Sequence, residues 1–99
     1  MAISQENRDF VGSLIDYYIG ESGSYRQMAE DYAPEIESVQ DAAFGIIVGC
    51  VHAGFLQAYQ SQQMTPDLGD MQELGKMIKE RAPLIRESVL DPGSKDREA

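Results

Sequence analysis

The sequence is poor in the residues that build metal and redox sites. Cys50 and His52 are its only cysteine and its only histidine, and it contains no Trp. One cysteine excludes a disulfide within the chain, and a lone thiol in an apolar stretch is usually inert packing. One cysteine and one histidine also exclude the ligand spacings of a zinc site. We therefore expect no catalytic residue set, no metal and no cofactor.

Basic residues are scarce as well. Lys and Arg number 8 against 17 Asp and Glu, which gives a formal net charge of −9. This charge would repel a phosphate backbone, so we expect no direct contact with nucleic acid. One acidic cluster is typical of a solvated face, or at most of weak divalent-cation binding. Its members are Glu30, Asp31, Glu35, Glu37 and Asp41.

The chain also lacks a long apolar run. Residues 42–56 contain no Asp, Glu, Lys or Arg, but this stretch is about 15 residues against the roughly 20 that span a bilayer. The N-terminal residues MAISQENRD do not have the basic segment and following apolar run of a signal peptide. We therefore expect a soluble, cytoplasmic protein without membrane contact.

No stretch alternates apolar and polar residues as a strand does, so the predicted class is all-α. Ser4 suits the N-cap of a helix over residues 4–19 that has one apolar stripe. Ser24 and Gln27 fit the capping box of a short helix over residues 24–33. Pro34 either kinks a longer helix or ends this one. We favour the break, with Pro34 as the first residue of a central helix over residues 34–62.

The last helix has the clearest start signal, with Thr65 as N-cap and Pro66 at the first helical position. Seven residues spaced three and four apart then form an a/d-like seam. They are Leu68, Met71, Gly75, Ile78, Ala82, Ile85 and Val89. Pro83 interrupts the seam and predicts a kink or a split. We expect one domain over residues 1–93 and a short polar tail over residues 94–99.

The central helix is apolar around its whole circumference, which is typical of a helix buried on all sides. A single small chain has too few helices to cover it, so we predict a homodimer. One face gathers small residues. Two glycines there cost roughly 1 kcal/mol each relative to alanine, which the close approach of a neighbouring helix would offset. The interface candidates on this face are Ala42, Gly45, Gly49, His52, Ala53 and Leu56.

The predicted fold is therefore a small bundle of three long helices plus one short helix. His52 is either an acid–base group or metal ligand, or a histidine satisfied at a helix contact, and the second reading is favoured because no partner is recognisable. The predicted function is that of a self-associating, non-enzymatic interaction protein, such as an adaptor or regulatory subunit with a protein partner. One alternative is an acidic inhibitor or nucleic-acid mimic that binds a basic groove. Another is a metal- or small-molecule-binding helical protein around His52.

Overall fold

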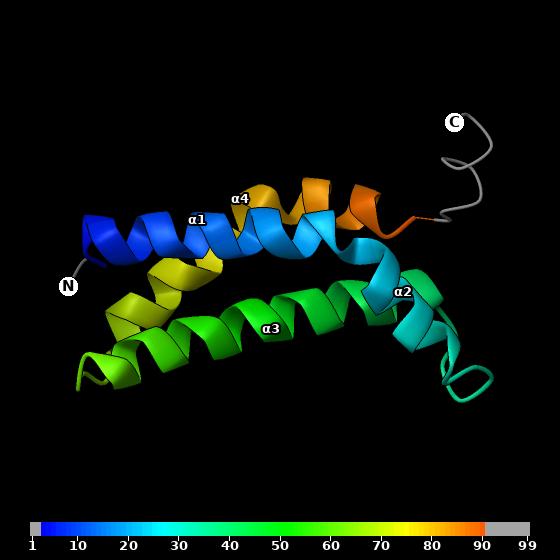
Figure 1. Ribbon diagram of the computed structural model, residues 1–99, viewed down its shortest axis with the longest axis horizontal. Helices are drawn as coiled ribbons and strands as arrows, with labels where there is room; N and C mark the ends of the chain where they lie inside the picture. Colours follow the sequence, from blue (N-terminus) through cyan, green and yellow to red (C-terminus); the bar gives the residue numbers. More distant parts are fainter. Residues whose placement is uncertain (1–2, 91–99) are drawn as a thin grey trace.

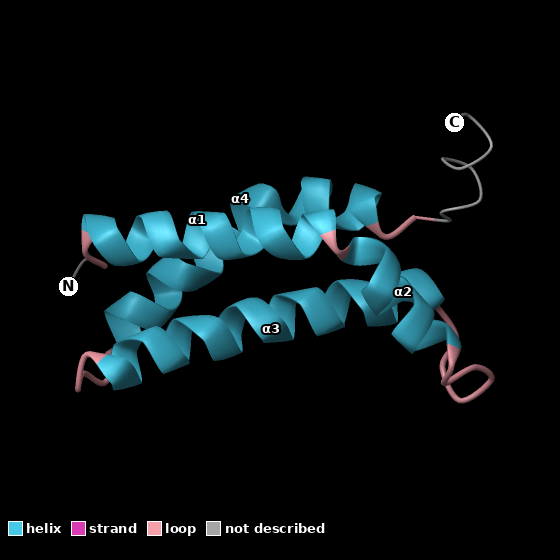
Figure 2. Cartoon of the chain, in the orientation of Figure 1, coloured by secondary structure: helices cyan, strands magenta, loops and turns pink. Residues whose placement is uncertain are grey.

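Four helices make up the secondary structure of residues 3–90, the part of the chain that the computed structural model describes (Figures 1 and 2). They are α1 (Gln5–Gly20), α2 (Ser22–Glu30), α3 (Val39–Ser61) and α4 (Leu68–Ser88). These residues contain no strand, which confirms the all-α prediction for this part of the chain. The predicted polar tail, residues 94–99, lies outside the described residues.

Helix α1 packs against both α3 and α4, and α2 packs mainly against α3. In Figure 1, α1 and α3 run lengthwise beside each other, and α2 turns the chain at one end of the bundle. Arg26 of α2 also reaches the end of α4, where its guanidinium donates to the backbone carbonyl of Val89 at 2.9 Å. Two ion pairs, Arg8–Glu73 and Arg81–Asp16, join α1 to α4.

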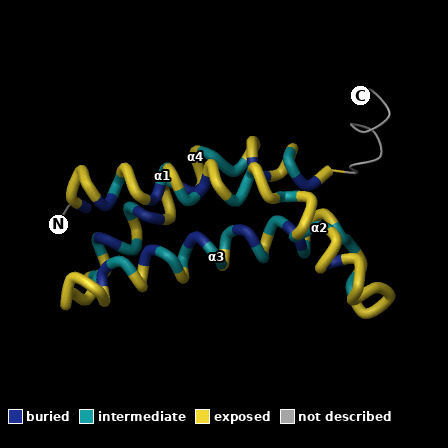
Figure 3. Tube along the Cα trace, viewed as in Figure 1, coloured by how far each residue is buried: buried dark blue, intermediate teal, exposed yellow. Residues whose placement is uncertain are grey.

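The core lies where one stripe of each long helix meets the others. Residues four apart along α3 are buried, and similar stripes from α1 and α4 face them. Figure 3 shows buried and exposed segments alternating along α3. The fully buried large side chains are Val11, Ile15, Ile47, Val51, Phe55, Leu74, Ile85 and Val89. Burying a side chain of this size contributes about 1.5–3 kcal/mol, so this contact holds the helices together.

A side-chain cap marks the start of α1, whereas α2 begins without one. Ser4 caps α1 as predicted, because its hydroxyl accepts the backbone N–H of Asn7 at 3.1 Å. The predicted capping box of Ser24 and Gln27 is wrong. Only Glu21 separates α1 from α2, so α2 already begins at Ser22, and the backbone N–H of Ser24 donates to the Glu21 carbonyl at 3.0 Å.

The chain breaks near Pro34, as favoured above, but Pro34 does not begin the next helix. It lies in a turn, and α3 begins at Val39. Ser38 explains the later start, because its hydroxyl accepts the backbone N–H of Asp41 at 3.1 Å and supplies a cap.

Helix α4 also starts later than predicted. The N-cap is Asp67, not Thr65, and it forms a reciprocal capping box with Asp70. Each carboxylate accepts the other residue's backbone N–H. Thr65 as N-cap could not form such a box, because its N3 residue would be Leu68, whose side chain has no acceptor.

The predicted seam of α4 is correct only in its second half. Ile78, Ile85 and Val89 are buried, whereas Leu68 is 73% exposed and Leu74 is buried in place of Gly75. Pro83 does not split α4, which continues to Ser88 and changes direction along its length (Figure 1). Proline bends a helix in this way because it removes one backbone hydrogen bond and its ring crowds the preceding turn.

Candidate functional site

The six interface candidates occupy one side of α3. At 100° per residue they fall within a sector of about 100°. We call this sector the outward face of α3; it consists of Ala42, Gly45, Gly49, His52, Ala53 and Leu56. Gly45, Gly49, Ala53 and Leu56 are exposed, whereas Ala42 and His52 are half-buried. The chain therefore leaves this apolar face open to solvent.

Within a single chain α3 is buried on one side only, and the dimer that would cover its other side stays a prediction. The buried residues of α3 form one stripe, because α1, α2 and α4 cover only one side of it. The uncovered side keeps the composition of a buried surface, with Leu56 44% exposed and no Lys, Arg, Asp or Glu between Ala42 and Leu56.

The glycines of α3 differ in their surroundings. A Cβ atom added to Gly45 or Gly49 would have no neighbour within 4 Å, so neither glycine permits a close helix contact inside this chain. Gly54 does, because a Cβ there would lie 2.6 Å from Cδ1 of Leu14 in α1. Gly45 and Gly49 therefore stay candidates for a contact with a second chain. Gly54, which precedes the deeply buried aromatic residue Phe55, was not identified from the sequence.

Helix α3 extends beyond the apolar run of residues 42–56 at both ends. It has 23 residues, and an 18-residue window in it reaches a mean hydropathy of 1.5 with 22% of that window buried. Among residues 3–90 it is the one helix long and apolar enough to cross a membrane by these measures, which the core helix of a soluble protein also satisfies.

The polar residues considered as site candidates, which are His52, the acidic cluster and Cys50, do not lie together at one site. His52 makes no hydrogen bond or ion pair with residues 3–90, and those residues hold no group of three or more His, Cys, Asp or Glu side chains placed to bind a metal. The five acids of the cluster between Glu30 and Asp41 are all exposed, and Glu30 pairs with Arg26. The free thiol of Cys50 is half-buried beside the outward face.

A partly buried polar junction, which was not identified from the sequence, joins α1 to the end of α3. The side-chain amides of Asn7 in α1 and Gln62 after α3 bond reciprocally, with Asn7 Nδ2 donating at 3.2 Å and Gln62 Nε2 donating at 2.9 Å. Nearby, burial raises the pKa of Tyr59, and the charge of Asp70 and a hydrogen bond to it raise it further. The signal was present, since Asn7 shares its helical stripe with Val11 and Ile15. This junction brings together α1, the end of α3 and the start of α4.

Tyrosine rings close the opposite end of the bundle. The rings of Tyr18 in α1 and Tyr25 in α2 meet edge to face with centroids 5.7 Å apart. Burial raises the pKa of both hydroxyls, and the Cys50 thiol raises it further. These tyrosines are half-buried and pack against the core with polar tips.

Comparison with protein-family models, with curated proteins and with solved structures finds no match to this chain. Its function therefore has to be inferred from its own geometry.

Proposed function

We propose that this protein acts through protein–protein contact rather than catalysis, and that it self-associates through the outward face of α3. The observation that carries this proposal is an exposed apolar helix face without an Asp, Glu, Lys or Arg side chain. Apolar area removed from water contributes about 25 cal/mol per Å², so an uncovered face of this kind favours association.

A second copy of the chain is the partner that best fits this face. Gly45, Gly49 and Ala53 project no bulk, so the backbones of two α3 helices can approach closely along them. A two-fold symmetric dimer needs a self-complementary patch, and an uncharged row of small residues satisfies that need. Each glycine costs roughly 1 kcal/mol in helix propensity, and no contact within the single chain offsets that cost. A close contact with a second α3 helix would offset it.

The test is sedimentation velocity on the wild-type chain at micromolar concentration, beside the variants Gly49→Leu and Gln27→Leu. We expect a dimer for the wild type and for Gln27→Leu, which changes an exposed residue on α2. We expect a monomer for Gly49→Leu. Its circular dichroism should remain helical, because the space around Gly49 is open and the fold tolerates a side chain there.

Two results would contradict the proposal. One is a wild-type chain that stays monomeric. The other is a Gly49→Leu chain that dimerises like the wild type. Flotation with phosphatidylcholine vesicles is a further check: co-flotation of the wild type that Gly49→Glu abolishes would assign the outward face to lipid instead of to a second copy.

A further inference from the structure

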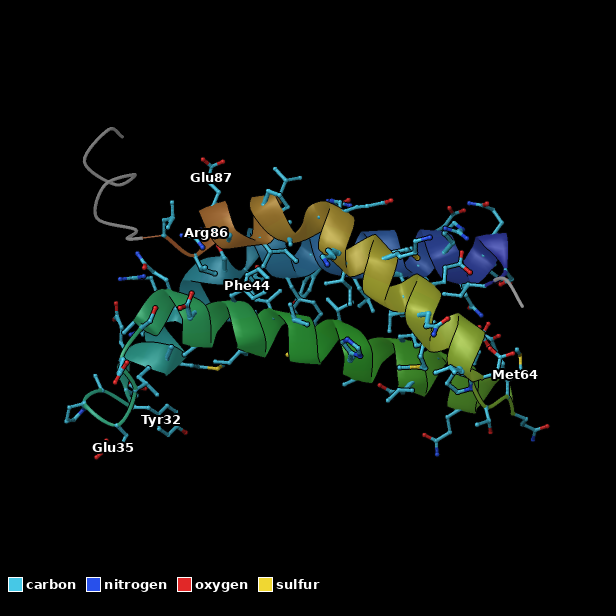
Figure 4. All side chains as sticks on the ribbon, turned by 180° about the vertical axis from the view of Figure 1, so that it is seen from behind. Tyr32, Glu35, Phe44, Met64, Arg86 and Glu87 are labelled. Carbon is cyan, nitrogen blue, oxygen red and sulfur yellow. The ribbon has the colours of Figure 1, made fainter. Side chains whose placement is uncertain are left out.

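A cavity of about 460 Å³ lies between the N-terminal part of α3 and the C-terminal part of α4. Its volume is within the range of about 300–1,000 Å³ that is usual for small-molecule sites. Phe44 of α3 and Ala82, Pro83 and Leu90 supply its apolar lining. Figure 4 shows Phe44 and Arg86 on the two facing helices at the same end of the bundle.

The charges around this cavity are unusual for the chain. Lys79 and Arg86 both line it, and they stand two turns apart on α4, about 10 Å along the helix axis. Neither has an ion-pair partner among residues 3–90, whereas Arg8, Arg26 and Arg81 each have one. Within residues 3–90 only Lys76, Lys79 and Arg86 lack an ion pair, and two of these three border the same apolar cavity.

Asp41 also borders the cavity, from α3. Two cations against one carboxylate leave the rim positive, and the cations flank Ala82 and Pro83 on one stripe of α4. A ligand that satisfies this arrangement has an apolar body for the lining and an anionic head for the rim. A carboxylate accepts hydrogen bonds from both ammonium and guanidinium groups, and from the latter in a bidentate manner.

We propose that this cavity binds amphiphilic carboxylates, with the apolar body against Phe44 and Ala82 and the carboxylate at Lys79 and Arg86. The site lies on the side of α3 that faces α4. It is therefore separate from the outward face, and either proposal can fail without the other.

The test is a two-dimensional amide NMR titration of the full chain with octanoate, 1-octanol and octylammonium. We expect octanoate to shift the amides of Phe44 and Ala82 saturably, with a dissociation constant near 1 mM or below. Octanol should bind more weakly, and octylammonium weaker still, because the rim is positive.

Two variants and a control locate the site. The exposed double variant Lys79→Gln/Arg86→Gln should weaken octanoate binding at least about tenfold and leave octanol unchanged. Ala82→Leu should fill the lining and weaken both ligands. Lys76→Gln, which removes another unpaired lysine of α4 outside this cavity, should bind like the wild type.

Three results at the cavity itself would overturn the proposal. They are the absence of saturable shifts at Phe44 and Ala82, octanoate binding that is unchanged in the double variant, and octylammonium binding as tight as that of octanoate. Shifts centred on Gly49 would also overturn it, because they would place the amphiphile on the outward face.

Discussion

Gly49 and Gly54 are five residues apart in α3, yet their surroundings are opposite. The space where a Cβ would lie is open at Gly49, and at Gly54 it is taken by Leu14. Replacing a helical glycine with alanine gains about 0.5–1 kcal/mol in backbone entropy where there is room. We therefore expect Gly49→Ala to raise the free energy of unfolding by that amount, measured by urea titration at a concentration where the chain is monomeric.

Gly54→Ala is the matched comparison. The added methyl must displace the Leu14 side chain, so the gain should be smaller than at Gly49, or reversed. Equal stabilisation by both substitutions would show that the contact of Gly54 with α1 is not tight.

Tyr59 gives the fold a dependence on alkaline pH. Its pKa lies above the ordinary value of 10.0 in the folded chain, because of burial and Asp70. The unfolded chain therefore ionises first as pH rises. The stability that Tyr59 contributes is complete below pH 10 and is lost as pH rises through its raised pKa.

We accordingly expect the free energy of unfolding to fall more steeply above about pH 10 in the wild type than in Tyr59→Phe, measured by urea titration between pH 9 and 11. Tyr32→Phe, at a 65% exposed site, is the control and should follow the wild type. Parallel curves for Tyr59→Phe and the wild type would contradict this account of Tyr59.

At the scale of the helix, the contribution of the α4 capping box to stability can be measured. Asp67 should stabilise the fold because its carboxylate accepts the backbone N–H of Asp70 at 2.7 Å. We expect Asp67→Ala to cost about 1 kcal/mol of unfolding free energy. Thr65→Ala, at the N-cap that the sequence predicted, should cost less than about 0.5 kcal/mol. The result that would contradict the observed helix start is the reverse order of these two costs in thermal unfolding.

Helix positions were predictable from sequence where a cap and an apolar stripe agree. Ser4 before a single stripe located α1 to within one residue. The starts of α3 and α4 were placed too early, because proline permits the first turn of a helix while a side-chain acceptor decides it, and Ser38 and Asp67 supply that acceptor.

The candidate site was predictable only in part, for a related reason. Periodicity identified six residues that share one face of α3, and it could not show that the chain leaves this face uncovered. The cavity beside Phe44 was not predictable either, because it brings residues about 40 positions apart into one wall. Such long-range contacts depend on packing and leave no local pattern.

The whole molecule carries a net charge of −9, which opposes the association of two copies. The outward face itself carries no Asp, Glu, Lys or Arg, so the repulsion acts at long range, and salt screens it. We expect the dissociation constant of the dimer to fall as sodium chloride is raised from about 0.02 M to about 0.5 M, measured by sedimentation equilibrium. A dimer that weakens with salt would instead indicate attraction between charged groups, such as the acidic cluster and a basic side chain.

The most direct test of the central claim is an isotope-filtered NMR experiment on a mixture of labelled and unlabelled chains. It detects only contacts between different copies. A dimer formed through the outward face of α3 predicts such contacts between the Ala53 methyl or Leu56 methyls of one chain and the Gly49 or Ala53 protons of another. The absence of contacts between chains at these residues, or contacts confined to other helices, would contradict the account.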